Sequence, residues 1–253
     1  MESTEIRPIA RFSCDLKEKF GAPRQAGIVP ALEGRVIFEP EYRDPEALRG
    51  LEGFSHLWLI WQFSENLRKD WSPTVRPPRL GGNRRLGVFA TRSPFRPNAL
   101  GLSCVRLLGI ERDGELGAVL RIGGADLMDG TPIFDVKPYV PYADAHPEAL
   151  SGFAPDPGAT LDLAFPPELE ARVPEEKRAA LRGVLANDPR PRYHSDPERI
   201  YGLRFGEQNV KFTVAGSCLM VVDVEDDISF LGEAGTHPNA DQASITRGRK
   251  GKA

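Results

Sequence analysis

The sequence lacks the glycine pattern on which the commonest nucleotide-binding sites depend. No two of its 25 glycines are separated by a single residue, so the G-x-G-x-x-G fingerprint is absent. In Rossmann folds that fingerprint brings a tight turn and a helix N-terminus against a pyrophosphate, and a similar loop is usual in Rossmann-type methyltransferases. The motifs GxxxxGK(S/T) and HExxH are absent as well. Any nucleotide-like ligand of this 253-residue chain is therefore expected to bind through another architecture.

Cysteine and histidine are both scarce. Cys14, Cys104 and Cys218 lie far apart and form no C-x-x-C pair, which excludes a zinc ribbon and a thioredoxin-type site. An odd number of separated cysteines suits a reducing compartment. The four histidines show no metal-ligand spacing, so we expect no bound metal.

Long apolar runs and a strong net charge are missing too. No stretch of about 18 apolar residues occurs, and we therefore expect no membrane span. The N-terminal MESTEIRPIA lacks the apolar core of a signal peptide, which favours a cytoplasmic location. Because the formal net charge is −3, the chain has no overall basic field, and contact with a nucleic acid has to be local.

The first 165 residues are rich in segments that predict short strands. Many glycines and prolines bound brief apolar or alternating runs, which is typical of strands. The bulky run HLWLIWQF predicts a central strand buried on both faces, and Asp113-Gly114 predicts a hairpin turn. Strands so spaced, without long helices between them, indicate a closed or nearly closed β-barrel. The predicted strands are 6–12, 35–38, 56–63, 86–92, 102–110, 118–122, 132–140 and 160–165.

The pattern changes at Pro166-Pro167. Residues 168–187 are rich in helix formers, with Leu181, Val184 and Leu185 on one stripe and Pro174 placed to open the helix. Three further strands are predicted, at 201–205, 210–214 and 219–224. The sequence thus predicts a mainly β protein with a β-barrel domain over 1–165, a small α+β domain over 166–225, and a disordered tail over 226–253.

Positive charge is concentrated in one segment. Between Arg68 and Arg106 nine arginines or lysines stand against a single acid, Asp70, and eight of the nine are arginine. Arginine suits bidentate contact with phosphate or carboxylate, so an anion or RNA-backbone patch is one interpretation. A solvated loop with structural arginines is the other.

Three polar, irregular segments stand out as candidate binding elements. They are KEKFGAPRQAG at 17–27, GVFATRSPFRPNALGLS at 87–103, and GGADLMDGTPIFDVKPYVPYAD at 123–144. In the second, Pro94 and Pro97 fix the backbone and so hold the neighbouring polar side chains with little ordering entropy lost on binding. In the third, DGTP is a turn signal whose backbone groups are candidates for gripping a ligand.

Taken together, these motifs resemble the TrmO (YaeB or TsaA-like) family of tRNA methyltransferases. The residues that carry the resemblance are RLGGNRRLGVFATRSPFRPNALGLS, DLMDGTPIFDVKPYVPYAD, APRQAG, FSHLWL and DPRPRY, and it covers nearly the whole chain from Ile6 to about Val224. Ala26 departs from the pattern, since proline is expected there. The resemblance implies a homodimeric barrel enzyme that binds S-adenosylmethionine. It further implies methylation of N6 of threonylcarbamoyl-adenosine, beside the anticodon of threonine tRNA.

The same resemblance and the chemistry of the cofactor suggest which residues bind it. A sulfonium cation is attracted by carbonyls or aromatic faces, and a carboxylate by N–H groups or arginine. Two turns would supply backbone groups, Arg92 a charge, Leu102 an apolar wall, and a strand end further contacts. The predicted cofactor-binding residues are Pro23, Arg24, Gln25, Ala26, Phe63, Ser64, Arg92, Leu102, Asp129, Gly130, Thr131 and Pro132.

For the tRNA substrate, we expect contacts from Arg96, Asn98, Arg190 and Tyr193. Arg190 and Tyr193 belong to DPRPRYH, where arginine beside tyrosine suits phosphate contact and base stacking, although a plain connecting loop would look the same. No residue is assigned as general base. A non-catalytic barrel that binds S-adenosylmethionine or RNA remains an alternative. A hydrolase of phosphate esters is another, but the sequence offers it no metal cluster and no nucleophile–base pair.

Overall fold

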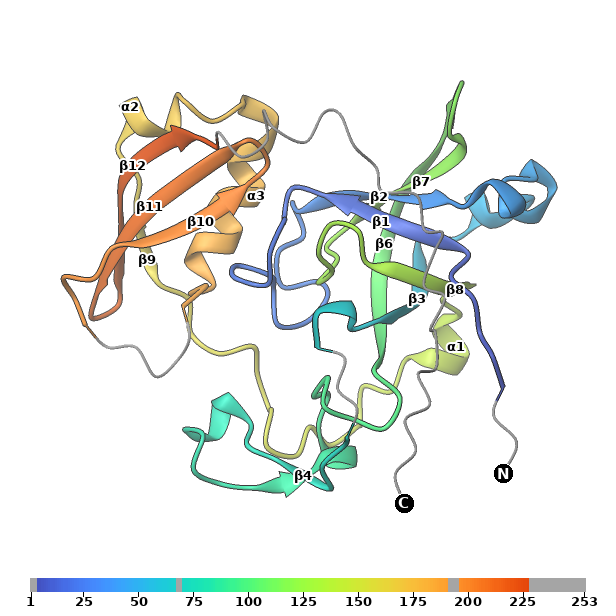
Figure 1. The fold of residues 1–253 in the computed structure, drawn as a ribbon, viewed down its shortest axis with the longest axis horizontal. Coiled ribbons are helices and arrows are strands. Elements are labelled where there is room, and N and C mark those ends of the chain that lie inside the picture. Colours follow the sequence, from blue (N-terminus) through green and yellow to red (C-terminus); the bar gives the residue numbers. More distant parts are fainter. Residues whose placement is uncertain (1–3, 67–69, 191–195, 228–253) are drawn as a thin grey trace, which may run out of the picture.

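Two large β-sheets organise the chain, and β4 (Thr74–Val75) and β5 (Leu86–Gly87) form a third, two-stranded one. The computed structural model describes residues 4–66, 70–190 and 196–227. A six-stranded closed barrel occupies the N-terminal part, and a four-stranded sheet forms a separate body beside it (Figure 1). The mainly β fold predicted from the sequence is confirmed. No helix within the described ranges is long and apolar enough to cross a membrane.

The barrel closes through antiparallel pairing in the order β1-β2-β7-β6-β3-β8. Closure joins Ala10 of β1 to Ile133 of β8. The register brings the last residues of β1, β3 and β7 and the first residues of β2, β6 and β8 to one end. The strands are β1 (Ala10–Cys14), β2 (Glu33–Phe38), β3 (His56–Gln62), β6 (Leu100–Asp113), β7 (Gly117–Gly123) and β8 (Pro132–Pro138).

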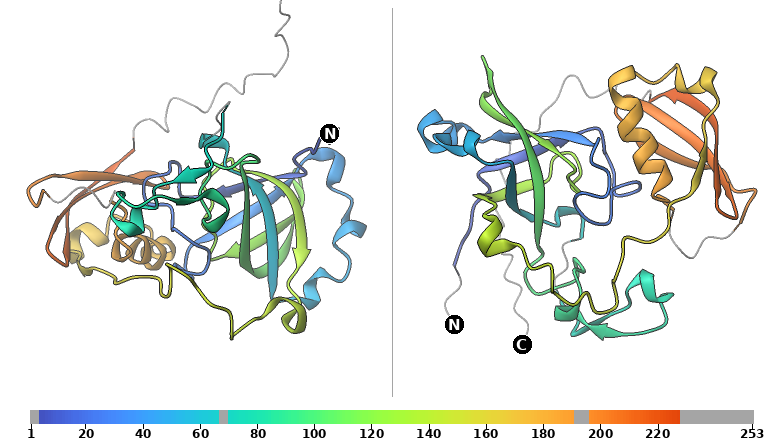
Figure 2. Two further views of the ribbon diagram at one scale, coloured as in Figure 1. Left: turned by 90° about the horizontal axis from the view of Figure 1, so that it is seen from below. Right: turned by 180° about the vertical axis from the view of Figure 1, so that it is seen from behind.

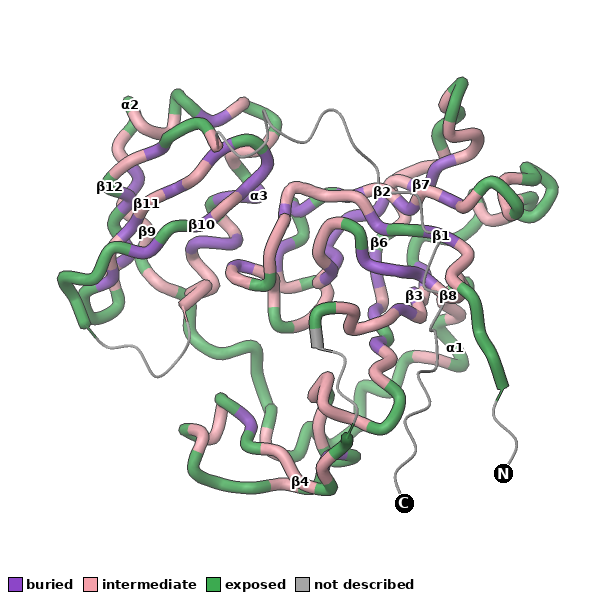
Figure 3. Tube along the Cα trace, viewed as in Figure 1, coloured by how far each residue is buried: buried purple, intermediate pink, exposed green. Residues whose placement is uncertain are grey.

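Alternating side chains fill the barrel. In β3, Leu57, Leu59 and Trp61 are buried while the residues between them are half-buried (Figure 3). The prediction that HLWLIWQF is buried on both faces is therefore wrong: the strand is central in the hydrogen-bonding order, but only one face is in the core. Gly101 lies against Trp61, where a Cβ would overlap the indole, so glycine makes room for the large ring.

The β6–β7 hairpin is the longest ribbon of the barrel. Its turn lies where the sequence predicts it, and the Asp113 carboxylate accepts the N–H groups of Glu115 and Leu116 at 3.0 Å each. β6 is longer than predicted, with 14 residues, and its pairing with β7 shifts register between Leu107 and Gly109. The turn and the start of β6 are therefore at opposite ends of the barrel (Figure 1).

An irregular arm connects β3 to β6. It contains η4 (Ser64–Asn66), β4 (Thr74–Val75), η5 (Pro78–Leu80), β5 (Leu86–Gly87) and η6 (Val88–Ala90). The predicted strand at 86–92 is wrong beyond Gly87, because the chain turns there: Thr91 donates its backbone N–H to the Val88 carbonyl at 3.1 Å. The arm is fastened by an ion pair of 2.7 Å between Arg79 and Asp156.

The C-terminal body has the strand order β10-β11-β12-β9, with α3 along one face (Figure 2). Leu181, Val184 and Leu185 of α3 are buried in its core, as the predicted stripe requires. The body is sheet-rich rather than evenly α+β. Its elements are β9 (Asp162–Ala164), α2 (Pro167–Glu170), α3 (Glu175–Ala186), β10 (Tyr201–Phe205), β11 (Gln208–Ala215) and β12 (Cys218–Asp226).

The boundary predicted at residue 165 needs correction. β9 was placed in the first domain by its sequence, yet it pairs in parallel with β12 and belongs to the second sheet. A three-residue strand carries too little pattern to show which sheet it joins. At the other end, the predicted tail begins within β12, and 228–253 lie outside the described residues. Short helices complete the fold: η1 (Pro40–Tyr42), η2 (Pro45–Leu48), η3 (Leu51–Gly53) and α1 (Pro141–Asp144).

The connection between β1 and β2 joins the two bodies. Leu16, Val29 and Leu32 from this connection are buried in the core of the C-terminal body. Asp15 accepts a bond of 2.8 Å from Lys177 of α3, and its carbonyl accepts the N–H of Gly206 at the same distance. The APRQAG segment is therefore held on a connection that is anchored on both sides.

Candidate functional site

The three irregular segments meet at one end of the barrel. The Arg92 guanidinium donates to the side-chain carbonyl of Gln25, which joins the 87–103 segment to the 17–27 segment. Gly27 donates its N–H to the carbonyl of Gly124 at 2.7 Å, which joins 17–27 to 123–144. These contacts bring together three segments that are spread over more than a hundred residues of the sequence.

Asp126 lies at the centre of this meeting point. Its carboxylate accepts a hydrogen bond of 2.5 Å from Ser103 Oγ, which in turn accepts one of 2.9 Å from the Trp61 indole N–H. Burial raises the pKa of the Asp126 carboxyl, while the Ser103 bond, the Arg92 charge and the backbone N–H of Ala26 act to lower it. The group is thus a carboxylate in a partly dry setting, surrounded chiefly by neutral donors.

Sequence reasoning missed Asp126. The nearby DGTP turn drew attention to the second aspartate of ADLMDG, and nothing in the local pattern distinguishes the first. The available signal is that Asp126 stands between Ala125 and Leu127, both buried, in an otherwise apolar stretch. An acid so placed is either paired or functional.

The DGTP turn is mainly a structural junction. Asp129 accepts the N–H of Cys14 and pairs with Lys17, both at 3.0 Å. The backbone N–H groups of Asp129, Gly130 and Thr131 donate to carbonyls of Leu16, Phe12 and Met128. Thr131 and Pro132 are buried. Phe12 also donates its N–H to the Thr131 carbonyl at 2.9 Å, so the expectation that this turn grips a ligand is limited to its remaining carbonyl groups.

The other predicted cofactor residues are spread around the meeting point. Pro23 and Ala26 are half-buried, and Arg24 reaches toward the C-terminal body, 3.5 Å from the Asp188 carbonyl. Phe63 packs edge-on against Trp61, with ring centroids 4.3 Å apart, and Ser64 begins η4 just after it. Leu102 is 55% exposed and points to the opposite face of β6 from Ser103, so its side chain does not join the Asp126 cluster.

The predicted substrate residues divide into two groups. Arg96 and Asn98 lie on the same loop as Arg92, and Arg96 steadies that loop by donating to the Thr91 carbonyl at 3.1 Å. Arg190 instead makes two bonds to Asp188, of 2.8 and 3.1 Å, and its side chain is only 11% exposed. Tyr193 lies outside the described residues.

An exposed aromatic pair on the arm was not foreseen. Trp71 is 52% and Phe89 71% exposed, and their rings stack with centroids 6.2 Å apart. Arg76, Arg84 and Arg85 of the same arm are exposed, and within the described residues none of the three makes an ion pair. Exposed rings and exposed arginines without a described ion pair, carried on one arm, are suited to unstacked bases and their phosphates.

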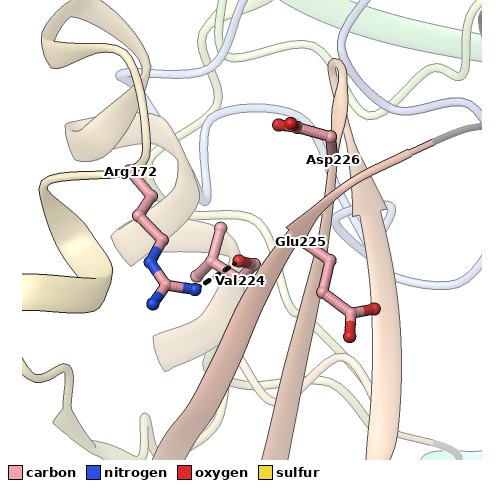
Figure 4. A pocket seen from close by; sticks show the side chains of 4 residues that line it. All are labelled: Arg172, Val224, Glu225 and Asp226. Atoms are coloured by element: carbon pink, nitrogen blue, oxygen red, sulfur yellow. Dashed lines mark hydrogen bonds between the residues drawn. The ribbon is translucent and has the colours of Figure 1, made fainter.

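A separate hollow of about 660 Å³ lies on the C-terminal body (Figure 4). It is lined by Arg172, Val224, Glu225 and Asp226 and contains none of the predicted site residues. Arg172 donates to the Val224 carbonyl at 3.0 Å and pairs with Asp223 at 3.3 Å, so its charge is already engaged. The meeting point at the barrel end is the stronger candidate site.

A closed antiparallel barrel with polar irregular segments gathered at one end, joined to a small sheet-rich body, defines a β-barrel protein outside the Rossmann class. Comparison with known proteins narrows this class. The chain belongs to the TrmO family: residues 11–145 match the tRNA-methyltransferase O N-terminal domain, and 158–227 match the TrmO C-terminal domain.

Individual relatives agree with this assignment. The chain is 40% identical over 234 residues to the tRNA (adenine(37)-N6)-methyltransferase of Escherichia coli strain K12, spanning 89% of this chain and 99% of that protein. It is 40% identical over 147 residues to the "Probable S-adenosyl-L-methionine-binding protein" of Pyrococcus abyssi, spanning 58% and 74%. A crystal structure of TrmO from Pseudomonas aeruginosa matches with a TM-score of 0.73 at 34% identity, covering 88% and 99%.

Proposed function

We propose that this protein is an S-adenosylmethionine-dependent tRNA methyltransferase that methylates N6 of threonylcarbamoyl-adenosine at position 37. Membership of the TrmO family supports the reaction class. The structural observation that carries the proposal is the convergence of Gln25, Arg92 and Asp126 at the barrel end. The position of the acceptor adenosine and its threonylcarbamoyl group are the finer part of the proposal.

The residues at the barrel end fit the cofactor chemically. S-adenosylmethionine, when bound, supplies an activated methyl group and carries two positive charges and one carboxylate. Arg92 offers a guanidinium for the carboxylate, and Asp126 offers a negative charge for a cation. Around them, the remaining predicted cofactor residues provide backbone carbonyls and apolar walls. The chain's own contribution would be to orient the donor and exclude water, which accounts for much of the acceleration of well-aligned reactions.

The arm supports tRNA as the partner. Trp71 and Phe89 offer aromatic faces, and the exposed arginines of the same arm offer charge, although the whole chain is slightly acidic. Stacking a base on an aromatic side chain is worth about 1–3 kcal/mol. We therefore expect Trp71→Ala to weaken tRNA binding by about ten- to a hundredfold. Phe54→Ala, an exposed phenylalanine of η3's C-terminal flank, is the matched control and should bind as the parent does in a filter-binding titration.

Arg96 and Asn98 are proposed to recognise the threonylcarbamoyl group. They share the proline-fixed loop of Arg92, and a carboxylate on the substrate matches an arginine there. A site built to pair with a polar group discriminates strongly against an analogue that lacks it, because its own polar groups are then left unpaired. An unmodified anticodon stem-loop should therefore be a much poorer substrate than a threonylcarbamoylated one.

Mass spectrometry of the two stem-loops, incubated with purified protein and S-adenosylmethionine, tests the function directly. A gain of one methyl on the modified adenosine is expected. Equal methylation of both stem-loops would remove the proposed specificity but keep the enzyme class. Binding of cofactor and RNA without any methyl transfer would favour the non-catalytic alternative.

Two further expectations belong to this proposal, namely a homodimer and a cytoplasmic location. Exposed apolar side chains on strands, such as Leu102 of β6, are surfaces that a second copy would cover. Light scattering at micromolar concentration should give twice the chain mass of 27.9 kDa. A single-chain mass would contradict the dimer.

A further inference from the structure

We propose that Asp126 is the counter-charge of the site, whose carboxylate faces a positive charge of the bound methyl donor. The inference rests on the proposed function and assigns to that site a residue that sequence reasoning did not find. It gives a role to an ionised carboxylate at a position where a neutral side chain would cost the fold less.

The geometry fixes the Asp126 carboxylate from one side. Ser103 Oγ donates to Oδ1 at 2.5 Å, and the buried Trp61 indole N–H orients that hydroxyl from 2.9 Å. Ser103 is itself buried, on the inner face of β6. The carboxylate is thus anchored to the barrel wall by a two-step relay, which holds its position without neutralising its charge.

The surrounding charges leave room for a cation. Arg92, from the 87–103 segment, is the ionised group that acts on Asp126 electrostatically, but its hydrogen bond goes to the neutral side chain of Gln25 and not to the Asp126 carboxylate. The 17–27 segment contributes the Ala26 N–H, and β3 and β6 contribute the neutral Trp61 and Ser103. Among the described residues, no basic nitrogen forms an ion pair with Asp126. A partly dry carboxylate without a salt bridge is an attractive position for a positively charged ligand.

Neighbouring Asp129 is the counterexample within the same segment. It pairs with Lys17 at 3.0 Å and accepts the N–H of Cys14, so its charge is already balanced by the protein. Asp126 has only the hydroxyl and backbone donors. The difference indicates that the balancing charge of Asp126 comes with the ligand.

The carboxylate charge of Asp126 should lower the stability of the ligand-free protein. Because burial raises the pKa of Asp126 in the folded state, the ionised form opposes folding, and stability falls as the pH rises through the folded-state pKa. Asp126→Asn keeps the shape and still accepts from Ser103. It should therefore leave the melting temperature at neutral pH unchanged or raise it, whereas a purely structural carboxylate would lower it on removal.

Calorimetric titration of the full chain with three ligands provides the test. S-adenosylmethionine carries a sulfonium and an ammonium, S-adenosylhomocysteine only the ammonium, and methylthioadenosine neither. In Asp126→Asn, we expect the affinity for S-adenosylmethionine to fall by about tenfold or more, and the affinity for methylthioadenosine to be unchanged. If Asp126→Asn lowers the affinity for S-adenosylhomocysteine as much as that for S-adenosylmethionine, Asp126 faces the ammonium. If the affinity for S-adenosylhomocysteine is unchanged, Asp126 faces the sulfonium.

Asp113→Asn is the matched control, since it removes the same charge at the opposite end of the barrel and retains the shape of the β6–β7 turn. It should leave all three affinities unchanged. The proposal would be overturned if Asp126→Asn lowered the affinity for all three ligands equally, or lowered none of the three affinities. Failure of the parent protein to bind any of the three would instead overturn the proposed cofactor, which keeps the two failures distinct.

Discussion

The arm and the C-terminal body differ in whether most of their described arginines are balanced by a carboxylate; Arg79 of the arm, paired with Asp156, is an exception. In the C-terminal body, Arg172, Arg182, Arg190 and Arg204 each pair with a carboxylate, at 2.6 to 3.3 Å. On the arm and the loop that follows it, Arg76, Arg84, Arg85, Arg92 and Arg96 make no ion pair within the described residues. Arginines balanced within the chain stabilise the fold, and those left unbalanced are available to an anionic partner. The difference separates a structural body from a binding surface.

Neutralising the arm should have the largest effect. Replacing Arg76, Arg84 and Arg85 by glutamine removes charges that no carboxylate balances, so tRNA affinity should fall by more than about a hundredfold at low salt. The salt dependence of binding should lose about three units of log–log slope. A filter-binding series at several salt concentrations measures both.

The matched control for that variant changes the net charge equally. Arg172, Arg182 and Arg204 replaced by glutamine should alter tRNA affinity little and reduce stability instead. Similar losses of affinity from the two triple variants would abolish the distinction between the regions.

Arg92→Ala comes next in size. Its guanidinium is exposed, donates to Gln25 and is the proposed partner of the cofactor carboxylate. We expect cofactor binding to weaken by about 1.5–3 kcal/mol, the usual range for a charged hydrogen bond. Calorimetry with S-adenosylmethionine measures this loss, and circular dichroism controls for folding. Unchanged titration in the folded variant would remove Arg92 from the site.

Arg190→Ala should act mainly on stability. Since Arg190 is almost buried and holds Asp188 with two bonds, its removal should lower the free energy of unfolding by about 1 kcal/mol. The effect on tRNA affinity should be smaller than that of any single arm arginine. Urea denaturation and RNA titration of the same preparation distinguish the two roles. A large loss of RNA affinity at unchanged stability would return Arg190 to the substrate site.

The smallest expected effect concerns pH. The hydrogen bonds from Arg182, both 2.6 Å, lower the pKa of Glu170. A carboxyl with a lowered folded-state pKa stabilises the fold above its unfolded pKa, and that contribution is lost as the pH falls through the folded-state value. Glu170→Gln should cost less than about 1 kcal/mol at neutral pH, because the pair is partly exposed, and nothing in strong acid. Glu168→Gln, an exposed neighbour, should show neither effect.

The sequence predicts the main outline of this molecule because its strands are short and cleanly bounded. The β6–β7 turn at Asp113-Gly114, the buried stripe of α3 and the three C-terminal strands lie where pattern and turn chemistry put them. Such features depend on neighbours in the chain. β9 and the bend after Gly87 depend on distant partners, on β12 and on the Pro73 carbonyl, and local pattern could not show them.

The candidate site divides in the same way. Arg92, Gln25 and Ala26 are in segments whose motifs are recognisable, and the structure brings them together. Asp126 and the Trp71–Phe89 pair were missed because their significance lies in what surrounds them in space: a serine of β6 in one case, a ring 18 positions away in the other. Arg190, predicted to contact the substrate, is bonded in the structure to Asp188, two positions before it, and its substrate role stays a prediction.

Closure of the barrel has a consequence for the order of folding. The β6–β7 hairpin joins residues close in sequence, whereas the pairing of Ala10 with Ile133 brings together the two ends of the whole barrel segment. Pairing residues that are far apart in the sequence has the largest loop-closure entropy cost. Such pairings become favourable only after local structure has formed. Gln25 and Arg92, 67 positions apart, also meet across a long separation. We therefore expect the hairpin to acquire hydrogen-exchange protection early in refolding, and competence to bind ligand to arrive last.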